Sequence, residues 1–421
     1  MSGTSVGIRR AVRILVMVAL VAAVTGAVRV KAATSGWQGE SIISVPATGD
    51  GWEPAIAADP TSPYVYTAWM QYSGPGISIY ERTSADGGST WGPAAPLCAS
   101  CGKGEYDVTL AATTSGAVYG TFMQGTHIEF TKSTNHGASW TAPLQVSGGT
   151  WADKPWMTAS ADGVDVYVMW STRGNIYAVS SHDSGATFST PAQITNEQYI
   201  YYYANGGTVL PNGTVVMAAS EYPEKGNNTK NTGPVNIVVF RSTDHGATWQ
   251  RTVADVLNTG ATFATSSVTT VSSDAAGNLV LLYSGSTSVG ANGKVYVRRS
   301  SNSGATWSTA AEMTTQASGA DATSVAVAGK GSLFVITWMD NRGGGWNVWE
   351  RQSTNAGSTW TADAKVSDAS SGASYKTAAG FGFPYGDYDT VAINSAGKAV
   401  AVMGEGDSSQ LHGDIWVNRQ N

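Results

Sequence analysis

One eight-residue pattern, Ser-x-Asp-x-Gly-x-x-Trp, recurs six times along this chain of 421 residues and constrains its fold more than any other feature. The copies begin at Ser84, Ser133, Ser181, Ser242, Ser300 and Ser353, so successive starts lie 49, 48, 61, 58 and 53 residues apart. A period of about 50 residues is typical of repeat architectures, in which each repeat is one small supersecondary unit. The chain is therefore expected to consist of similar units packed side by side.

Each copy is preceded by a short stretch of alternating apolar and polar residues, such as residues 77–82 (Ile-Ser-Ile-Tyr-Glu-Arg). This alternation predicts a β-strand, the third of its unit. A seventh such strand, residues 414–419, lies near the end of the chain where another copy would begin. Residues 37–45 resemble the segment that follows a copy elsewhere, for example residues 140–146, so they are expected to supply the fourth strand of this last unit.

Seven inner strand pairs can be counted, with starts near Glu53, Tyr106, Lys154, Ala204, Thr265, Ala322 and Tyr388. We therefore predict an all-β fold, a β-propeller of seven four-stranded blades over residues 37–421. Pairing of the N-terminal strand with the C-terminal blade would close the ring and leave no free sheet edge. A ring of six blades with one extra hairpin is the alternative.

The repeated pattern is the Asp box, and on its six copies the chain resembles the Asp-box, or BNR-repeat, sialidase-like β-propeller superfamily. The third position of the box holds Asp86, Asn135, Asp183, Asp244, Asn302 and Asn355. Turn formation needs only an acceptor oxygen, whereas proton transfer or cation binding needs a charge, so the box is expected to be structural. Sialidases of this superfamily have six blades, and the predicted seventh is a departure from them.

The ends and the charge of the chain indicate an exported protein that does not bind nucleic acid. Arg9 and Arg10, an apolar run over residues 14–28 and the small residues Ala32 and Ala33 resemble a secretory signal over residues 1–33. The apolar run is short for a spanning helix, so no stable membrane insertion is expected after the signal is removed. With 24 basic and 30 acidic residues and a net charge of −6, no basic stripe suited to nucleic acid is present.

The two cysteines, Cys98 and Cys101, form a Cys-Ala-Ser-Cys sequence. In an exported chain such a pair is expected to be a small local disulfide, with a redox centre as the alternative. The isolated histidines and the acidic loops show no metal-ligand spacing, and no cofactor is expected. The chain is expected to be a monomer.

The boxes occupy turns between third and fourth strands, so the functional face of the ring is expected on the opposite side, where inner strands start and second strands end. The strand starts carry Glu53, Asp107, Lys154, Asp387, Tyr388 and Asp389. The loops after second strands carry Arg173, Glu221, Asp340, Arg342 and Glu405. Each of these residues, taken alone, also fits a solvated polar loop.

The family resemblance implies roles for some of these side chains. Sialidases use a Tyr nucleophile activated by a Glu, an Asp as acid and base, and three arginines that grip the substrate carboxylate. Residues 388–392, Tyr-Asp-Thr-Val-Ala, resemble the late segment that carries the nucleophile. The resemblance thus implies Tyr388 as nucleophile, Glu221 or Glu405 as its activator and Asp340 as acid and base, with Arg173, Arg342 and Lys154 binding the carboxylate.

The first arginine of the family is absent, because its place is taken by Trp52-Glu53-Pro54. This departure favours a neutral or another acidic sugar over sialic acid. Glu53, Asp107, Asp387 and Asp389 offer an alternative pair of carboxylates for acid and base chemistry. Two functions remain open from the sequence: a secreted sialidase-like glycoside hydrolase acting on a glycan or polysaccharide, and a non-catalytic extracellular propeller that binds glycans or proteins.

Overall fold

The computed structural model describes residues 1, 34, 36–45, 49–73, 76–149, 151–172, 174–196, 200–223, 234–257, 269–288, 291–314, 319–367, 389–406 and 413–421. Of residues 73, 200–205, 223 and 406 only the backbone is described. In this part of the chain there is no helix, and hence no helical segment long and apolar enough to cross a membrane.

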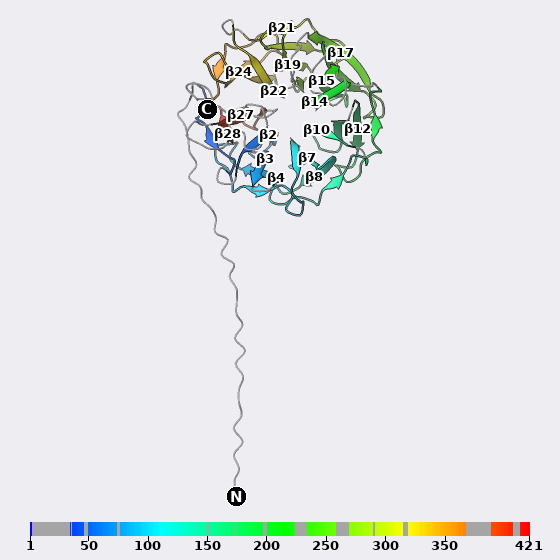
Figure 1. The fold of residues 1–421 in the computed structure, drawn as a ribbon, viewed down its shortest axis with the longest axis vertical. Coiled ribbons are helices and arrows are strands. Elements are labelled where there is room, and N and C mark those ends of the chain that lie inside the picture. The colour runs from blue at the N-terminus through cyan, green and yellow to red at the C-terminus, as the bar shows by residue number, and fades with distance from the viewer. Residues whose placement is uncertain are drawn as a thin grey trace.

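The described strands form seven antiparallel four-stranded sheets arranged around a centre, as Figure 1 shows. Blade 1 contains β2 (Gly51–Ala58), β3 (Val65–Ser73), β4 (Gly76–Ser84) and β5 (Ala95–Pro96). Blade 2 contains β6 (Glu105–Ala112), β7 (Val118–Gln124), β8 (His127–Ser133) and β9 (Leu144–Gln145). Blade 3 contains β10 (Asp153–Ala159), β11 (Val166–Ser171), β12 (Ile176–Ser181) and β13 (Ala192–Gln193).

Blades 4 to 7 complete the ring. Blade 4 contains β14 (Ile200–Val209), β15 (Val215–Pro223), β16 (Val235–Ser242) and β17 (Gln250–Leu257). Blade 5 contains β18 (Thr269–Ser273), β19 (Leu279–Gly285), β20 (Lys294–Ser300) and β21 (Ala311–Glu312). Blade 6 contains β22 (Ala322–Lys330), β23 (Leu333–Asp340), β24 (Asn347–Ser353) and β25 (Ala364–Lys365). Blade 7 contains β26 (Thr390–Ile393), β27 (Ala399–Gly406), β28 (Gly413–Arg419) and the N-terminal β1 (Ser41–Ile42). The prediction of seven blades is confirmed.

The ring closes through the N-terminal segment, as predicted. Strand β1 pairs antiparallel with β28, with Ser41 opposite Val417 and Ile42 opposite Trp416. Before it, Trp37 bridges to Gln420, and the Gln38 amide donates to the Arg419 carbonyl at 2.9 Å. The first described strand thus covers the edge that β28 would otherwise expose to other chains.

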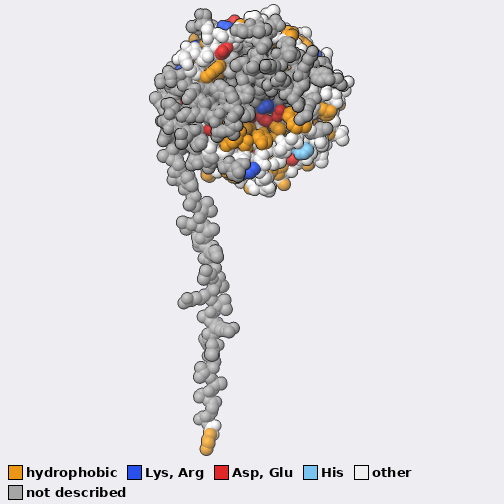
Figure 2. All heavy atoms as spheres, viewed as in Figure 1, with side chains coloured by type: hydrophobic (Ala, Val, Ile, Leu, Met, Phe, Trp, Pro, Cys, Tyr) orange, Lys and Arg blue, Asp and Glu red, His pale blue; other side chains and the backbone are white. Residues whose placement is uncertain are grey.

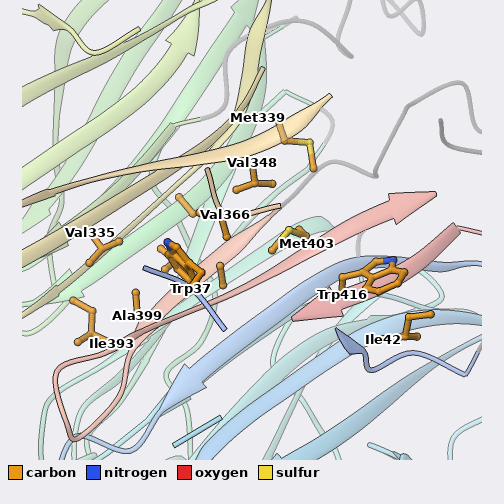
Figure 3. Close-up of a cluster of buried hydrophobic side chains, with 13 residues drawn as sticks. Trp37, Ile42, Val335, Met339, Val348, Val366, Ile393, Ala399, Met403 and Trp416 are labelled. Carbon is orange, nitrogen blue, oxygen red and sulfur yellow. The ribbon is translucent and has the colours of Figure 1, made fainter. Parts of the chain in front are cut away.

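Hydrophobic cores lie between neighbouring blades, and the one at the closure shows the arrangement best (Figure 3). Trp37, 1% exposed, packs among Val335 and Val366 of blade 6 and Ile393 and Met403 of blade 7. The closing segment therefore buries apolar surface as well as adding backbone hydrogen bonds. Burial of apolar surface stabilises the folded state by about 25 cal/mol for each Å² removed from water.

All six Asp boxes have the same hydrogen bonds. In the first, Ser84 Oγ donates to Asp86 Oδ1 at 2.8 Å, and the amides of Gly88 and Thr90 donate to Ser84 Oγ and Asp86 Oδ1. The fifth residue of every box is a glycine with positive φ, such as Gly88 at 92°, a conformation that glycine adopts without steric cost. The terminal aromatic residues pack against the hydrophobic clusters: Trp91, Trp140, Phe188, Trp249, Trp307 and Trp360.

Asp and Asn are interchangeable in these turns, which supports their structural role. In boxes with Asp, the hydroxyl of the seventh residue donates to the second carboxylate oxygen, as Thr90 Oγ1 does to Asp86 Oδ2 at 2.6 Å. In boxes with Asn, the amide donates to the same hydroxyl, as Asn302 Nδ2 does to Thr306 Oγ1 at 2.8 Å. The hydrogen bond is kept and only its direction is reversed.

The first prediction concerns Asp86. Asp86→Ala removes the carboxylate that accepts hydrogen bonds from Ser84, Ser89 and Thr90 and is expected to lower the free energy of unfolding by about 1–2 kcal/mol, whereas Asp86→Asn is expected to leave it within about 0.5 kcal/mol at pH 7. Burial opposes ionisation of Asp86, but hydrogen bonds from Thr90 and Ser84 outweigh it and lower its pKa. A lowered folded-state pKa gives stability that is lost as the pH falls, so the wild type should lose stability relative to Asp86→Asn in acid. Urea unfolding at pH 7 and pH 3 measures both differences.

The boxes lie on the same face as the turns between first and second strands. The Gly87 amide donates to the Pro63 carbonyl at 2.7 Å, and the Ser184 amide donates to the Val164 carbonyl at 2.9 Å. Pro63 and Val164 belong to the turns before β3 and β11. The inner strands therefore start on the opposite face, where the sequence places the functional groups.

Candidate functional site

A β-bulge near the start of the inner strand recurs in several blades and directs one side chain per blade. The strand register shifts between Trp52 and Ala55 in β2, and equivalent shifts occur in β6, β10 and β22. The first bulge residues have positive φ: Glu53 (50°), Asp107 (50°), Lys154 (53°) and Ser324 (49°). This conformation is unfavourable for residues with a side chain and clusters at functional sites.

Asp107 lines a cavity of about 90 Å³ between the inner strands of six blades, and the residues that directly follow Glu53, Lys154 and Ser324 line it as well. Its walls are mostly apolar, with Ile56, Leu110 and Val327 among them, and its two carboxyl groups belong to Asp107 and Asp389. We call Glu53, Asp107, Lys154, Ser324 and Asp389 the channel mouth. Figure 2 shows acidic and basic side chains together near the middle of one face, bordered by hydrophobic ones.

Asp107 and Lys154 form an ion pair between blades 2 and 3. Lys154 Nζ lies 3.0 Å from Asp107 Oδ1, and the two side chains are 10% and 7% exposed. The Asp107 amide also donates to Met70 Sδ of blade 1 at 3.2 Å. Removing one partner of such a buried pair leaves the other charge uncompensated, so the two residues fix each other at the mouth.

Asp389, which directly precedes β26, is a buried carboxyl group that accepts one hydrogen bond from the described part of the chain. The Gly404 amide donates to its Oδ1 at 3.3 Å, and among the described residues no group hydrogen-bonds to its Oδ2. Burial raises the pKa of Asp389 well above its usual value, the Gly404 hydrogen bond opposes this, and the negative charge of the neighbouring Glu405 adds to it. The protonated, neutral form of Asp389 is thus favoured over a wider pH range than for an ordinary Asp.

Tyr72, at the end of β3, is a neutral hydrogen-bonding group beside Glu53. Burial raises the pKa of Tyr72 to about 12, and the charges of Glu53, Tyr106 and Asp50 add to this. Its ring packs at a tilt against Trp52, with 5.3 Å between the centroids. From the sequence, Tyr72 is expected among the polar residues of the functional face, but the electrostatic effect of Glu53 on it is visible only in the structure.

Two of the predicted catalytic carboxylates are engaged within their own blades. Glu221 accepts hydrogen bonds from Asn236 Nδ2 at 3.0 Å and from the guanidinium of Arg251, which lies on the outer strand β17. Asp340 accepts from Trp338 Nε1 at 2.9 Å and pairs with Arg342. These contacts tie both carboxylates to neighbours in blades 4 and 6.

Arg342 likewise forms ion pairs with residues of its own blade. Its Nε lies 2.9 Å from both oxygens of Asp340, and its Nη1 lies 2.6 Å from Asp363 Oδ2 beside the outer strand β25. Its guanidinium carbon lies 4.0 Å above the ring of Trp349. These contacts of the guanidinium come from blade 6 itself, whereas the sequence predicted that Arg342 binds a substrate carboxylate.

The structure brings together Glu53, Asp107, Lys154 and Asp389 at the mouth, with Glu405 beside Asp389. Tyr388, Asp387 and Arg173 lie outside the described residues, as do residues 2–33 of the predicted signal. Ser324 was missed, because a bulge in β22 is visible only in the strand register. Among the described residues, three side chains of metal-ligating type come close together, Cys98, Cys101 and Glu105, and the two sulfurs are joined in a disulfide.

Solved structures similar to this chain share its propeller fold. An ulvan lyase, a polysaccharide lyase, has 11% identity and a TM-score of 0.60 over 89% of this chain and 95% of its own. A protein of unknown function from Dyadobacter fermentans has 11% identity and a TM-score of 0.52 over 90% and 97%. A Hadza microbial sialidase has 14% identity and a TM-score of 0.49 over 85% and 73%. At these identities the likeness shows the fold alone.

Sequence comparison connects the repeats to a family. No curated protein sequence matches the chain. The family model described as the BNR repeat-like domain matches residues 154–375, more than half of the chain, and this stretch contains the last four of the six Asp boxes. With the repeated turns, the seven blades and this match in agreement, the chain belongs to the BNR repeat-like family of sialidase-like β-propellers.

Proposed function

We propose that this chain is an exported glycoside hydrolase that cleaves glycans at the channel mouth, with Asp389 as the general acid. The observation that carries the proposal is the state of Asp389. It is a buried carboxyl group with a raised pKa and with no hydrogen-bonding partner for Oδ2 among the described residues, and it lines the same cavity as Asp107. A carboxyl group whose raised pKa favours its protonated form can donate that proton to a departing glycosidic oxygen.

In the two-carboxylate mechanism of most glycoside hydrolases, a second carboxylate acts as nucleophile or as base for water. Asp107 is the best placed, because it lines the cavity with Asp389 and Lys154 holds it in position at 3.0 Å. Glu53, on the equivalent bulge of blade 1, is the other carboxylate of the mouth. The neutral phenol of Tyr72 beside Glu53 can donate a hydrogen bond to a sugar hydroxyl or ring oxygen.

The charges at the mouth favour a neutral glycan as substrate. The mouth contains three carboxyl groups, Glu53, Asp107 and Asp389, and its one cation, Lys154, is paired with Asp107. Arg342 is occupied by Asp340 and Asp363. With Asp389 protonated and Asp107 paired with Lys154, an anionic sugar would still meet the carboxylate of Glu53. A neutral sugar can instead place its apolar face against Trp156, which lines the cavity.

A substrate screen tests this proposal and the sialidase mechanism together. The secreted chain is assayed with fluorogenic neutral glycosides, glucuronides and sialosides, and with polysaccharides followed by reducing ends and by the ultraviolet absorbance of unsaturated uronates. Cleavage of neutral glycosides that survives in Tyr388→Phe supports the carboxylate mechanism. Cleavage of sialosides alone, abolished by Tyr388→Phe, would replace it with the tyrosine mechanism implied by the family.

The remaining alternative, a non-catalytic glycan-binding propeller, gives a different result in the same experiment. Glycan arrays and titration calorimetry would then detect binding of a glycan that the protein does not cleave. Binding without turnover of any bound glycan would overturn the hydrolase proposal. Unsaturated products would instead indicate proton abstraction from a uronate, as in a lyase.

A further inference from the structure

The Cys98–Cys101 disulfide lies in the loop between β5 of blade 1 and β6 of blade 2, on the face where the inner strands start. Cys98 is 8% exposed and packs in a cluster with Leu97, Val108 and Phe122, whereas Cys101 is partly exposed beside them. The expected local disulfide is thus confirmed. Cys101 is therefore the more exposed partner of the disulfide, and Cys98 is the more buried one.

A buried carboxyl group stands next to this disulfide. Glu105, the first residue of β6, is 1% exposed, and one of its oxygens lies within 4.8 Å of both sulfurs. Its Oε2 accepts a hydrogen bond from the Ile79 amide at 2.8 Å, while no described residue hydrogen-bonds to its Oε1. An enclosed carboxyl oxygen without a hydrogen bond is costly, and a purely structural disulfide gains nothing from it.

We propose that Cys98 and Cys101 form a reversible dithiol–disulfide site, at which Glu105 exchanges a proton with the sulfur of the more buried Cys98. The reaction partner is a dithiol. Its thiolate attacks Cys101 Sγ, the sulfur–sulfur bond breaks, and the electron pair passes to Cys98 Sγ, which takes the proton of Glu105. The second thiol of the partner then attacks the partner's own sulfur in the mixed disulfide, and Cys101 leaves as a thiolate that takes up the proton this thiol gives up. The proton that the first partner thiol lost on forming its thiolate returns through water to Glu105, so the partner is oxidised to a disulfide and the protein is reduced by two electrons.

The surroundings of Glu105 suit proton transfer in both directions near neutral pH. Burial raises the pKa of Glu105 to about 7, while the Ile79 amide and the charge of Lys103 oppose the shift. Lys103 is the one charged group acting on Glu105 within the described part of the chain, and Gln124, opposite Glu105 on β7, is neutral. Protonated Glu105 supplies the proton during reduction, and ionised Glu105 removes the Cys98 proton during reoxidation.

The test follows reoxidation of the intact, folded chain. The protein is reduced with dithiothreitol, freed of it and mixed with glutathione disulfide; samples are quenched with acid and analysed by mass spectrometry. Cys101 first forms a mixed disulfide with glutathione. Cys98 then attacks this mixed disulfide and forms the Cys98–Cys101 disulfide again. Glu105→Gln keeps an acceptor for the Ile79 amide but cannot take a proton. We therefore expect formation of the Cys98–Cys101 disulfide at pH 7 to be at least about tenfold slower and the mixed disulfide to accumulate.

The pH dependence and a matched variant separate proton transfer from a loss of packing. As the pH rises, hydroxide in the solvent increasingly removes thiol protons without a carboxylate, so the difference between wild type and Glu105→Gln should shrink. Glu81 is also buried, and burial raises its pKa to about 7 as well, but it lies outside the group formed by Cys98, Cys101 and Glu105. Glu81→Gln should therefore form the disulfide at the wild-type rate. Equal rates of disulfide formation in wild type and Glu105→Gln, a tenfold loss in Glu81→Gln, or a disulfide that dithiothreitol does not reduce in the folded protein would overturn the proposal.

Discussion

Asp389→Asn is expected to lower kcat on an unactivated glycoside by about a hundred- to ten-thousand-fold, the usual contribution of a general acid. Asn occupies the same volume and can still accept the Gly404 hydrogen bond, but it has no proton to give. A substrate with a highly acidic phenol as leaving group needs little protonation and should lose much less. Steady-state kinetics on the two substrate types measure this difference.

The pH profile gives an independent check on the role of Asp389. Because only the protonated form donates, kcat of the wild type should fall as the pH rises through the pKa of Asp389, which burial places well above that of an ordinary Asp. The residual activity of Asp389→Asn should lack this decline. Asp86→Asn, the same chemical change in a structural turn, serves as the control and should keep wild-type kcat. An unchanged kcat in Asp389→Asn on both substrates would remove Asp389 from the mechanism.

Deleting residues 1–45 is expected to abolish cooperative folding, whereas deleting residues 1–33 is expected to leave stability unchanged. The longer deletion removes Trp37, Ile42 and Ile43, all of which are buried in the cores beside blade 7. Loss of a buried Trp costs about 3–5 kcal/mol, and loss of each buried Ile about 2–5 kcal/mol. The sum is comparable to the entire stability of a typical domain, about 5–15 kcal/mol.

The same deletion also uncovers the backbone edge of β28, so the variant should associate as well as unfold. Urea unfolding followed by Trp fluorescence and size-exclusion chromatography measure the two effects. The shorter deletion controls for the handling of a truncated chain, since it keeps every contact described for residues 34–45. Equal unfolding midpoints for the two variants would show that the N-terminal strand does not hold the ring closed.

The fold followed from the sequence because its determinants are local and repeated. Each Asp box needs only a serine, an Asx residue and a glycine at fixed offsets, and the same hydrogen bonds form in all six copies. The closure of the ring was also predictable, because residues 37–45 resemble the segment after a box. A pattern that recurs at a fixed period predicts an architecture even where no single strand could be assigned alone.

The site was predictable only in part, because its properties depend on tertiary contacts. Glu53, Asp107 and Lys154 were recognised as strand starts, but the bulges that give them positive φ appear only in the strand register. Arg342 pairs with Asp340 and also with Asp363, which lies 21 positions further along the chain. No sequence motif connects Arg342 with Asp363. The raised pKa of Asp389 comes from burial by surrounding blades, and its neighbour Glu405 lies on the next strand.

The pairing of β1 with β28 also sets the order of events during biosynthesis. A chain emerging from the ribosome can assemble blades 1 to 6 in sequence, but Trp37 and Ile42 must wait for Trp416 and Val417. At about 5–20 residues per second, that wait is roughly 20–80 seconds for this chain. During this interval the N-terminal strand has no partner, so the last blade completes only after synthesis is essentially finished.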